Sequence, residues 1–272
     1  MADNSPDDGF AWQLGVWDKM AGIYQQEIDT RFVPVVECVL SRANLQPGET
    51  ALDLGTGTGS VAFAAAARVG AGGRITAVDI SPEMLAKARA GAAAQSLANI
   101  DFEEGRGEAI PAPDRSHDAV LASLSLMYVI DRAATAREIA RVLRPGGRLV
   151  AAVWAGPDQT DIVQFQQIAG SFAPTPPVEG VGPGVLADPT PFLGQLADAG
   201  LEAHVETETT EFRFSDFDSA WNALAGVTTA ALDLAVQNQA KSAVRERMWS
   251  TGNGPRVFRN ATHFIIAKKS ST

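Results

Sequence analysis

Apolar and polar positions follow two different periods along the central part of the chain. Short apolar runs have the continuous character of buried strands, and the stretches between them repeat apolar residues at helical spacing. The expected strands span 50–55, 72–80, 99–105, 117–126 and 148–154, and the expected helices span 61–69, 81–95 and a stretch from Arg132 that Pro145-Gly146-Gly147 ends. Strands that alternate with helices in this way predict an α/β fold, a parallel sheet with helices on both faces.

The flanking segments are less regular. Residues 10–43 repeat apolar positions as two or three short helices do, and 155–187 contain too many prolines and glycines for one long helix. Beyond them the pattern predicts a helix over 189–200, a strand over 201–214, helices within 216–250 and a closing strand over 261–269.

Composition excludes several classes of protein. Hydrophobic residues make up 46% and charged residues 20%, as in globular proteins, and the formal charge of −10 disfavours nucleic acid and anionic lipid as partners. One cysteine, Cys38, and three histidines argue against a disulfide framework and against a metal site. The acidic, polar first residues resemble no signal peptide, and no apolar run is long enough to span a membrane, so we expect a cytoplasmic protein without membrane insertion.

The strongest chemical signal is a glycine-rich loop between the first strand and its helix. It reads Asp53-Leu54-Gly55-Thr56-Gly57-Thr58-Gly59, and glycines there let the backbone approach a ligand closely. The third glycine comes one residue earlier than in the dinucleotide fingerprint, which has Ser60 in its place here. Asp79 ends the second strand, where it is placed to accept both hydroxyls of a ribose or, alternatively, to open the turn before Ser81.

The sequence resembles the class I S-adenosylmethionine-dependent methyltransferases, and within them the branch similar to ubiquinone/menaquinone-biosynthesis enzymes. The matching stretches, in the family's order, are LDLGTGTG, AVDISPEML, EGRGEAIPAPDRSHDAV and EIARVLRPGGRLVAAVW. They cover residues 48–155 closely and 189–208 more loosely. The resemblance implies a Rossmann-like, seven-stranded, mostly parallel sheet whose last strand is antiparallel. It also implies an N-terminal helical cap over 1–48 and a methyltransferase domain over 49–272, with lid segments at about 155–187 and 215–258.

The same resemblance implies a cofactor site for S-adenosylmethionine, with S-adenosylhomocysteine as product. Asp79 would hold the ribose, Ile80 and Met84 would flank the adenine, and Ser123 would lie near the cofactor's amino group. Met84 is equally compatible with a helix core. The glycine loop would contact the methionine part, with Asp53 beneath it, so the candidate loop residues are Asp53, Gly55, Thr56, Gly57 and Gly59.

One segment departs from the branch. Gly105-Arg106-Gly107 stands where relatives carry Gly-Asp-Ala, and arginine has no acceptor for the adenine amine. Backbone groups or Glu108 would replace that contact, while Arg106 would stack on the base or point to solvent. We therefore expect weaker adenine recognition at Arg106, Gly107 and Glu108.

Catalytic groups are harder to assign. Tyr24 matches an aromatic position of the branch, where a helix covers the cofactor, although a core tyrosine is an equal alternative. Tyr128 follows the fourth strand, and Met127 stands where many relatives have a histidine. Tyr24 and Tyr128 are the only catalytic candidates, and the aromatic residues of the outer segments suit a small, partly hydrophobic acceptor.

The leading hypothesis is methyl transfer to an oxygen, nitrogen or carbon atom of such a metabolite. A cofactor-binding protein without catalysis is the alternative, and a nicotinamide-dependent oxidoreductase is a weaker one because of the glycine spacing. Exposed aromatic residues on the amino-terminal helix are also compatible with a homodimer.

Overall fold

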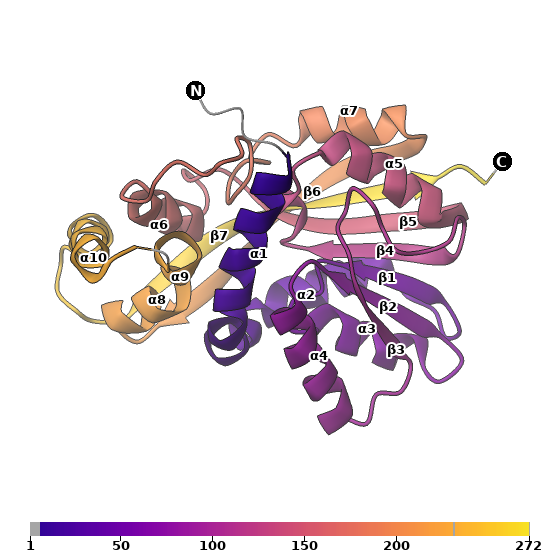
Figure 1. Ribbon diagram of the computed structural model, residues 1–272, viewed down its shortest axis with the longest axis horizontal. Helices are drawn as coiled ribbons and strands as arrows, with labels where there is room; N and C mark the ends of the chain where they lie inside the picture. Colours follow the sequence, from indigo (N-terminus) through magenta and orange to yellow (C-terminus); the bar gives the residue numbers. More distant parts are fainter. Residues whose placement is uncertain (1–5, 231, 272) are drawn as a thin grey trace.

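The computed structural model describes residues 6–230 and 232–271, so residues 1–5 of the expected cap lie outside the described part. Its centre is a seven-stranded sheet in the order β3-β2-β1-β4-β5-β7-β6 (Figure 1). The strands are β1 (Thr50–Leu54), β2 (Arg74–Asp79), β3 (Ile100–Glu104), β4 (His117–Ser123), β5 (Leu143–Trp154), β6 (Leu201–Phe214) and β7 (Arg256–Lys269). Strands β1 to β5 pair in parallel, and β7 is antiparallel to both of its neighbours. The predicted Rossmann-like sheet is confirmed.

Helices cover the sheet and extend past its edge. The amino-terminal segment is one nearly continuous helix with a five-residue π-helix, η1, in its middle. The helical elements are α1 (Pro6–Ile23), η1 (Tyr24–Ile28), α2 (Asp29–Ala43), α3 (Ser60–Val69), α4 (Pro82–Ala94), the 3-10 helix η2 (Leu126–Tyr128), α5 (Arg132–Val142), α6 (Asp161–Gly170), α7 (Thr190–Asp198), α8 (Phe217–Leu224), α9 (Gly226–Thr229) and α10 (Leu234–Met248). Helices α6, α8, α9 and α10 gather beyond one end of β6 and β7, at the left of Figure 1.

Local chemistry explains where several helices and strands begin or end. Helix α4 begins as predicted, because the Ser81 hydroxyl accepts the Met84 N–H at 3.1 Å and Pro82 occupies the first helical position. Helix α5 ends at Val142, earlier than the prediction, because Pro145 disfavours helical backbone at the residue before it. Strand β5 then begins at Leu143, five residues before the expected Arg148, and the register against β4 shifts between these two residues.

Two other predicted bounds are also corrected. Strand β4 ends at Ser123, short of the expected Leu126, because Leu124 has a positive φ of 58°. Strand β7 begins at Arg256 rather than Ala261, because its first residues pair with the far end of β6, where Phe214 faces Arg256. Charged side chains in that stretch hide the strand pattern in the sequence.

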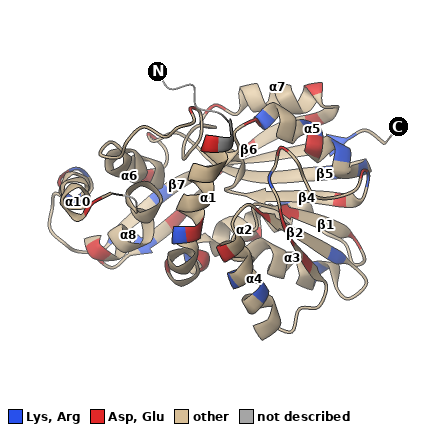
Figure 2. Cartoon of the chain, viewed as in Figure 1, with Lys and Arg blue, Asp and Glu red and all other residues tan. Residues whose placement is uncertain are grey.

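The surface carries acidic and basic residues side by side. Figure 2 shows Lys and Arg interspersed with Asp and Glu along the elements, which agrees with ion pairs such as Arg74–Asp101 and Arg148–Glu49. No helix within the described part of the chain is both long enough and apolar enough to cross a membrane.

Candidate functional site

A cavity lies at the carboxyl ends of β1, β2 and β4. It has about 1050 Å³ of empty space, its open mouth included. Loop residues that follow the strands form one side, and α1, η1 and the start of α2 form the other. Parallel strands bring such loops together at one edge of the sheet, which is where open α/β sheets bind ligands.

The glycine loop forms part of the cavity wall. The Gly55 and Thr56 N–H groups donate to the Val78 carbonyl at 2.8 and 2.9 Å, which fastens the loop to β2. Gly55 has a φ of +74°, and a Cβ there would lie 2.4 Å from the Cβ of Ser125, so no other residue fits without a shift. A Cβ at Gly57 would meet nothing within 4 Å, because this glycine borders open space.

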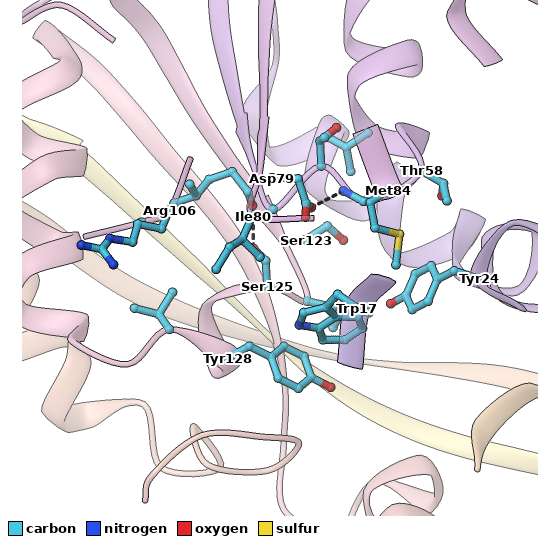
Figure 3. Close-up of a pocket in the computed structure, with 18 of the residues that line it drawn as sticks. Trp17, Tyr24, Thr58, Asp79, Ile80, Met84, Arg106, Ser123, Ser125 and Tyr128 are labelled. Atoms are coloured by element: carbon cyan, nitrogen blue, oxygen red, sulfur yellow. Dashed lines mark hydrogen bonds between the residues drawn. The ribbon is translucent and has the colours of Figure 1, made fainter. Parts of the chain in front are cut away.

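Asp79 presents a fixed carboxylate at the cavity edge (Figure 3). Its oxygens accept the Gly57 N–H at 2.8 Å and the Ser81 N–H at 2.9 Å. Burial raises the pKa of Asp79, although these two N–H groups act in the opposite direction. The side chain therefore opens the turn before α4 and also faces the cavity, so the two alternatives weighed for it are compatible. An ionised carboxylate with two such bonds retains acceptor capacity for hydroxyl groups.

Asp53 and Gly59 are not among the residues that line the cavity. Asp53 lies beneath the loop, where one oxygen accepts the Thr56 hydroxyl at 2.6 Å and Oδ1 has no hydrogen-bond partner. Burial raises the pKa of Asp53 to about 7. Gly59 precedes α3 with a φ of +99° and faces the ring of Phe63. Both residues support the loop from behind rather than touching the cavity.

Residues 105–108 also line the cavity. The Arg106 guanidinium lies 4.0 Å from the ring centroid of Phe10, and the side chain is directed away from Asp79 and Tyr24 (Figure 3). Glu108 Oε1 accepts the Ile130 and Asp131 N–H groups at 2.9 and 3.1 Å. In this structure Arg106 therefore stacks on a ring of its own chain, and Glu108 holds the segment after β4.

Four aromatic side chains that line the cavity contact one another. The ring of Trp17 contacts the rings of Tyr24 and Tyr128 edge-on, with centroid distances of 6.0 and 4.7 Å. The ring of Tyr24 also contacts that of Phe32 edge-on, with a centroid distance of 6.1 Å. Burial raises the pKa of both tyrosines, and for Tyr24 the neighbouring Tyr128 adds to the effect. Both hydroxyls therefore keep their protons at neutral pH and are not ready bases there.

Ile80, Met84 and Ser123 also line the cavity, as do Tyr24 and Tyr128, whereas Met127 is buried outside it. The three histidines lie elsewhere. His117 is buried with a pKa lowered to about 4 by desolvation, and His263 contacts Thr207. Within residues 6–230 and 232–271, no group of His, Cys, Asp and Glu has the arrangement to hold a metal ion.

The sequence reasoning missed the pairing of Asp29 with Thr58 inside the cavity. The Thr58 hydroxyl donates to the Asp29 carboxylate at 2.7 Å, and burial raises the pKa of Asp29. Gln13 was missed as well, and its amide donates to the Tyr128 carbonyl at 2.5 Å. Asp29 begins α2, and an acidic residue at a helix start has a local explanation, so no pattern in the sequence pointed to Thr58 as its partner.

Comparison with known proteins identifies the central segment. Residues 52–151 match the family model described as a methyltransferase domain. The nocamycin O-methyltransferase of Saccharothrix syringae is 39% identical over 134 residues, which cover 49% of this chain and 48% of that protein. The arsenite methyltransferase of Halobacterium salinarum is 32% identical over 180 residues, or 65% of this chain and 44% of that protein. The chain thus matches about half the length of these relatives or less.

The fold recurs in solved structures. The YcgJ protein of Bacillus subtilis aligns with a TM-score of 0.64 and 18% identity, over 87% of this chain and 98% of that one. At this identity the likeness concerns the fold, and it extends to elements on both sides of the matched segment.

Proposed function

Because residues 52–151 form a class I S-adenosylmethionine-dependent methyltransferase domain, we propose that the cavity binds S-adenosylmethionine and that the chain transfers its methyl group to a small, partly hydrophobic metabolite. The accepting atom is an oxygen, nitrogen or carbon, and S-adenosylhomocysteine is released. One observation carries the proposal: the family segment contributes the glycine loop, Asp79 and residues 105–108 to the same cavity. Membership of the ubiquinone branch stays a prediction.

The cavity residues suit this cofactor. Asp79 would accept the ribose hydroxyls, Ile80 and Met84 would flank the adenine, and the open space at Gly57 would admit the methionine part. Three carboxylate residues, Asp29, Asp79 and Glu108, line the cavity against one cation, Arg106, which suits a ligand with an ammonium and a sulfonium charge.

When bound, the cofactor supplies a methyl group on a cationic sulfur for in-line displacement. The tasks of this chain are then to orient the two reactants and to exclude water, which the helical cover of α1 and η1 and the rings of Trp17 and Tyr24 serve. Because the Tyr24 and Tyr128 hydroxyls keep their protons, they would donate hydrogen bonds to an acceptor molecule rather than remove its proton. An acceptor that is already nucleophilic at neutral pH fits this site best.

The absence of a histidine at Met127 favours one alternative, a protein that binds the cofactor without catalysis. A nicotinamide-dependent oxidoreductase is less consistent with the glycine spacing. The oxidoreductase differs from the proposal in the cofactor that it binds. The non-catalytic protein differs only in that it releases no S-adenosylhomocysteine when an acceptor is supplied.

The test is a calorimetric titration with S-adenosylmethionine, S-adenosylhomocysteine and NAD in parallel. We expect the first two to bind and Asp79→Ala to weaken them at least about tenfold, because a charged hydrogen-bond acceptor is lost. Glu103→Ala, an exposed residue on β3 outside the cavity, is the control and should bind as the original chain does. Binding of NAD alone would refute the proposal.

A further inference from the structure

A second pocket adjoins the first and shares four of its residues. It has about 350 Å³ of empty space, its open part included. Both pockets are lined by Tyr24, Phe32, Leu124 and Tyr128. The second pocket therefore adjoins the first at these four side chains.

The other walls of the second pocket come from outside the methyltransferase segment. They are contributed by η1, the end of β5 and helices α6, α8 and α9, through residues such as Trp154, Leu224 and Val227. No lining residue of this pocket carries a formal charge, and nearly all are aromatic or aliphatic. Such a lining favours an uncharged, mainly apolar group, because a charge would lose its hydration without gaining a partner.

One buried polar atom in the wall of this pocket lacks a hydrogen-bond partner. Gln166, on α6, is only 7% exposed, and its buried Oε1 has no hydrogen-bond partner. Its helix is held in place, because the Ile162 N–H donates to Asn260 at 3.0 Å and Thr160 donates to the Ala261 carbonyl at 3.0 Å. Buried amide oxygens in folded proteins nearly always accept a hydrogen bond from the protein or from a bound molecule, so the donor for Gln166 Oε1 has to come from a molecule in this pocket.

We propose that this pocket is the acceptor site and that Gln166 determines specificity by accepting a hydrogen bond from an uncharged, mainly apolar acceptor carrying a hydroxyl or N–H group. The inference rests on the proposed function, since it needs the cofactor in the adjoining cavity. It narrows the substrate class to neutral molecules, with the reacting end at the wall of Tyr24 and Tyr128 and a donor group toward α6.

The experiment uses the full chain saturated with S-adenosylhomocysteine and three probes that share a methylphenyl group: 4-methylphenol, toluene and 4-methylbenzoate. Ligand-observed NMR titrations give the three affinities. We expect 4-methylphenol to bind about three- to tenfold more tightly than toluene, the usual worth of one hydrogen bond, and 4-methylbenzoate to bind most weakly.

Gln166→Leu should reduce the affinity for 4-methylphenol to that for toluene and leave toluene unchanged. The melting temperature should stay the same or rise, because an unsatisfied buried oxygen is removed, and a purely structural role of Gln166 would instead lower it. The matched control is Gln164→Leu, an exposed glutamine on the same helix, which should bind all probes normally. Val227→Phe narrows the pocket and should weaken both 4-methylphenol and toluene.

Equal effects of Gln166→Leu on both neutral probes, no effect on 4-methylphenol, or tightest binding of 4-methylbenzoate would each overturn the inference. So would a chain that binds S-adenosylhomocysteine but none of the probes, and in that case the proposed cofactor site stands. If S-adenosylhomocysteine itself fails to bind in calorimetry of the same samples, the proposed function fails and this inference falls with it.

Discussion

The buried carboxyl of Asp53 makes the stability of the protein depend on pH in a defined direction. Burial raises its pKa from 3.8 to about 7, and its Oδ1 has no hydrogen-bond partner. Below about pH 4 the group is protonated in the folded and the unfolded chain. Between about pH 4 and 7 the unfolded chain releases the proton while the folded chain keeps it, so the free energy of unfolding falls as the pH rises. Above about pH 7 the loss is complete.

Asp53→Asn removes this ionisation and keeps the size of the side chain. A difference of about three pKa units corresponds to about 4 kcal/mol at most, at about 1.4 kcal/mol per unit. Thermal unfolding of both proteins should be measured from pH 4.5 to 8.5. The melting temperature of the variant should rise relative to that of the original chain as the pH rises, by up to roughly 10 °C.

Asp118→Asn is the control for this experiment. Burial alone would raise the pKa of Asp118, but the Thr50 N–H and Arg144 outweigh it and the pKa is lowered. Asp118 stays ionised throughout pH 5 to 8 in both the folded and the unfolded chain. The melting temperatures of Asp118→Asn and the original chain should therefore differ by a constant amount over this range, because protonation removes the stabilisation by the Asp118 carboxylate only at lower pH. Parallel melting curves for Asp53→Asn and the original chain would refute the reasoning about Asp53.

Three further predictions concern the cavity. Gly55→Ala should weaken S-adenosylhomocysteine binding by about tenfold or more, because the added Cβ would collide with Ser125 at a residue with a positive φ. Gly15→Ala in α1 is the control and should leave binding unchanged, because its Cβ would meet open space. Equal calorimetric affinities of the two variants would contradict this prediction. Tyr24→Leu should reduce the affinity for S-adenosylmethionine about three- to tenfold more than the affinity for S-adenosylhomocysteine, because only the first carries a sulfonium charge that an aromatic face attracts. An equal loss of affinity for both ligands in parallel titrations would contradict a contact between Tyr24 and the sulfonium. Arg106→Asp supplies the missing acceptor and should tighten S-adenosylhomocysteine binding about two- to tenfold over Arg106→Ala, and no difference would exclude an adenine contact there.

Elements with a strong local signal could be predicted from the sequence. Strand β6 was predicted with the observed bounds, and the Ser81 cap placed the start of α4 correctly. The sheet edge that carries the cavity followed from the strand–helix alternation, because parallel strands bring the loops after β1, β2 and β4 together.

Features that depend on distant partners could not be predicted. The first residues of β7 become strand only because β6 extends beside them, and the stacking of Arg106 on Phe10 joins segments far apart in the chain. The pairing of Asp29 with Thr58 has the same origin. The unsatisfied Gln166 is the clearest case, because its position on α6 reads as ordinary helix and the pocket beside it is formed by residues from distant parts of the chain.

The most direct test of the central claim is a crystal structure of the chain with S-adenosylhomocysteine. The account predicts the ligand in the cavity after β1, β2 and β4, with the ribose hydroxyls on the Asp79 carboxylate, the adenine beside Ile80 and Met84, and the sulfur facing the wall of Tyr24 and Tyr128 that both pockets share. Ligand bound elsewhere, or bound with its ribose away from Asp79, would contradict it.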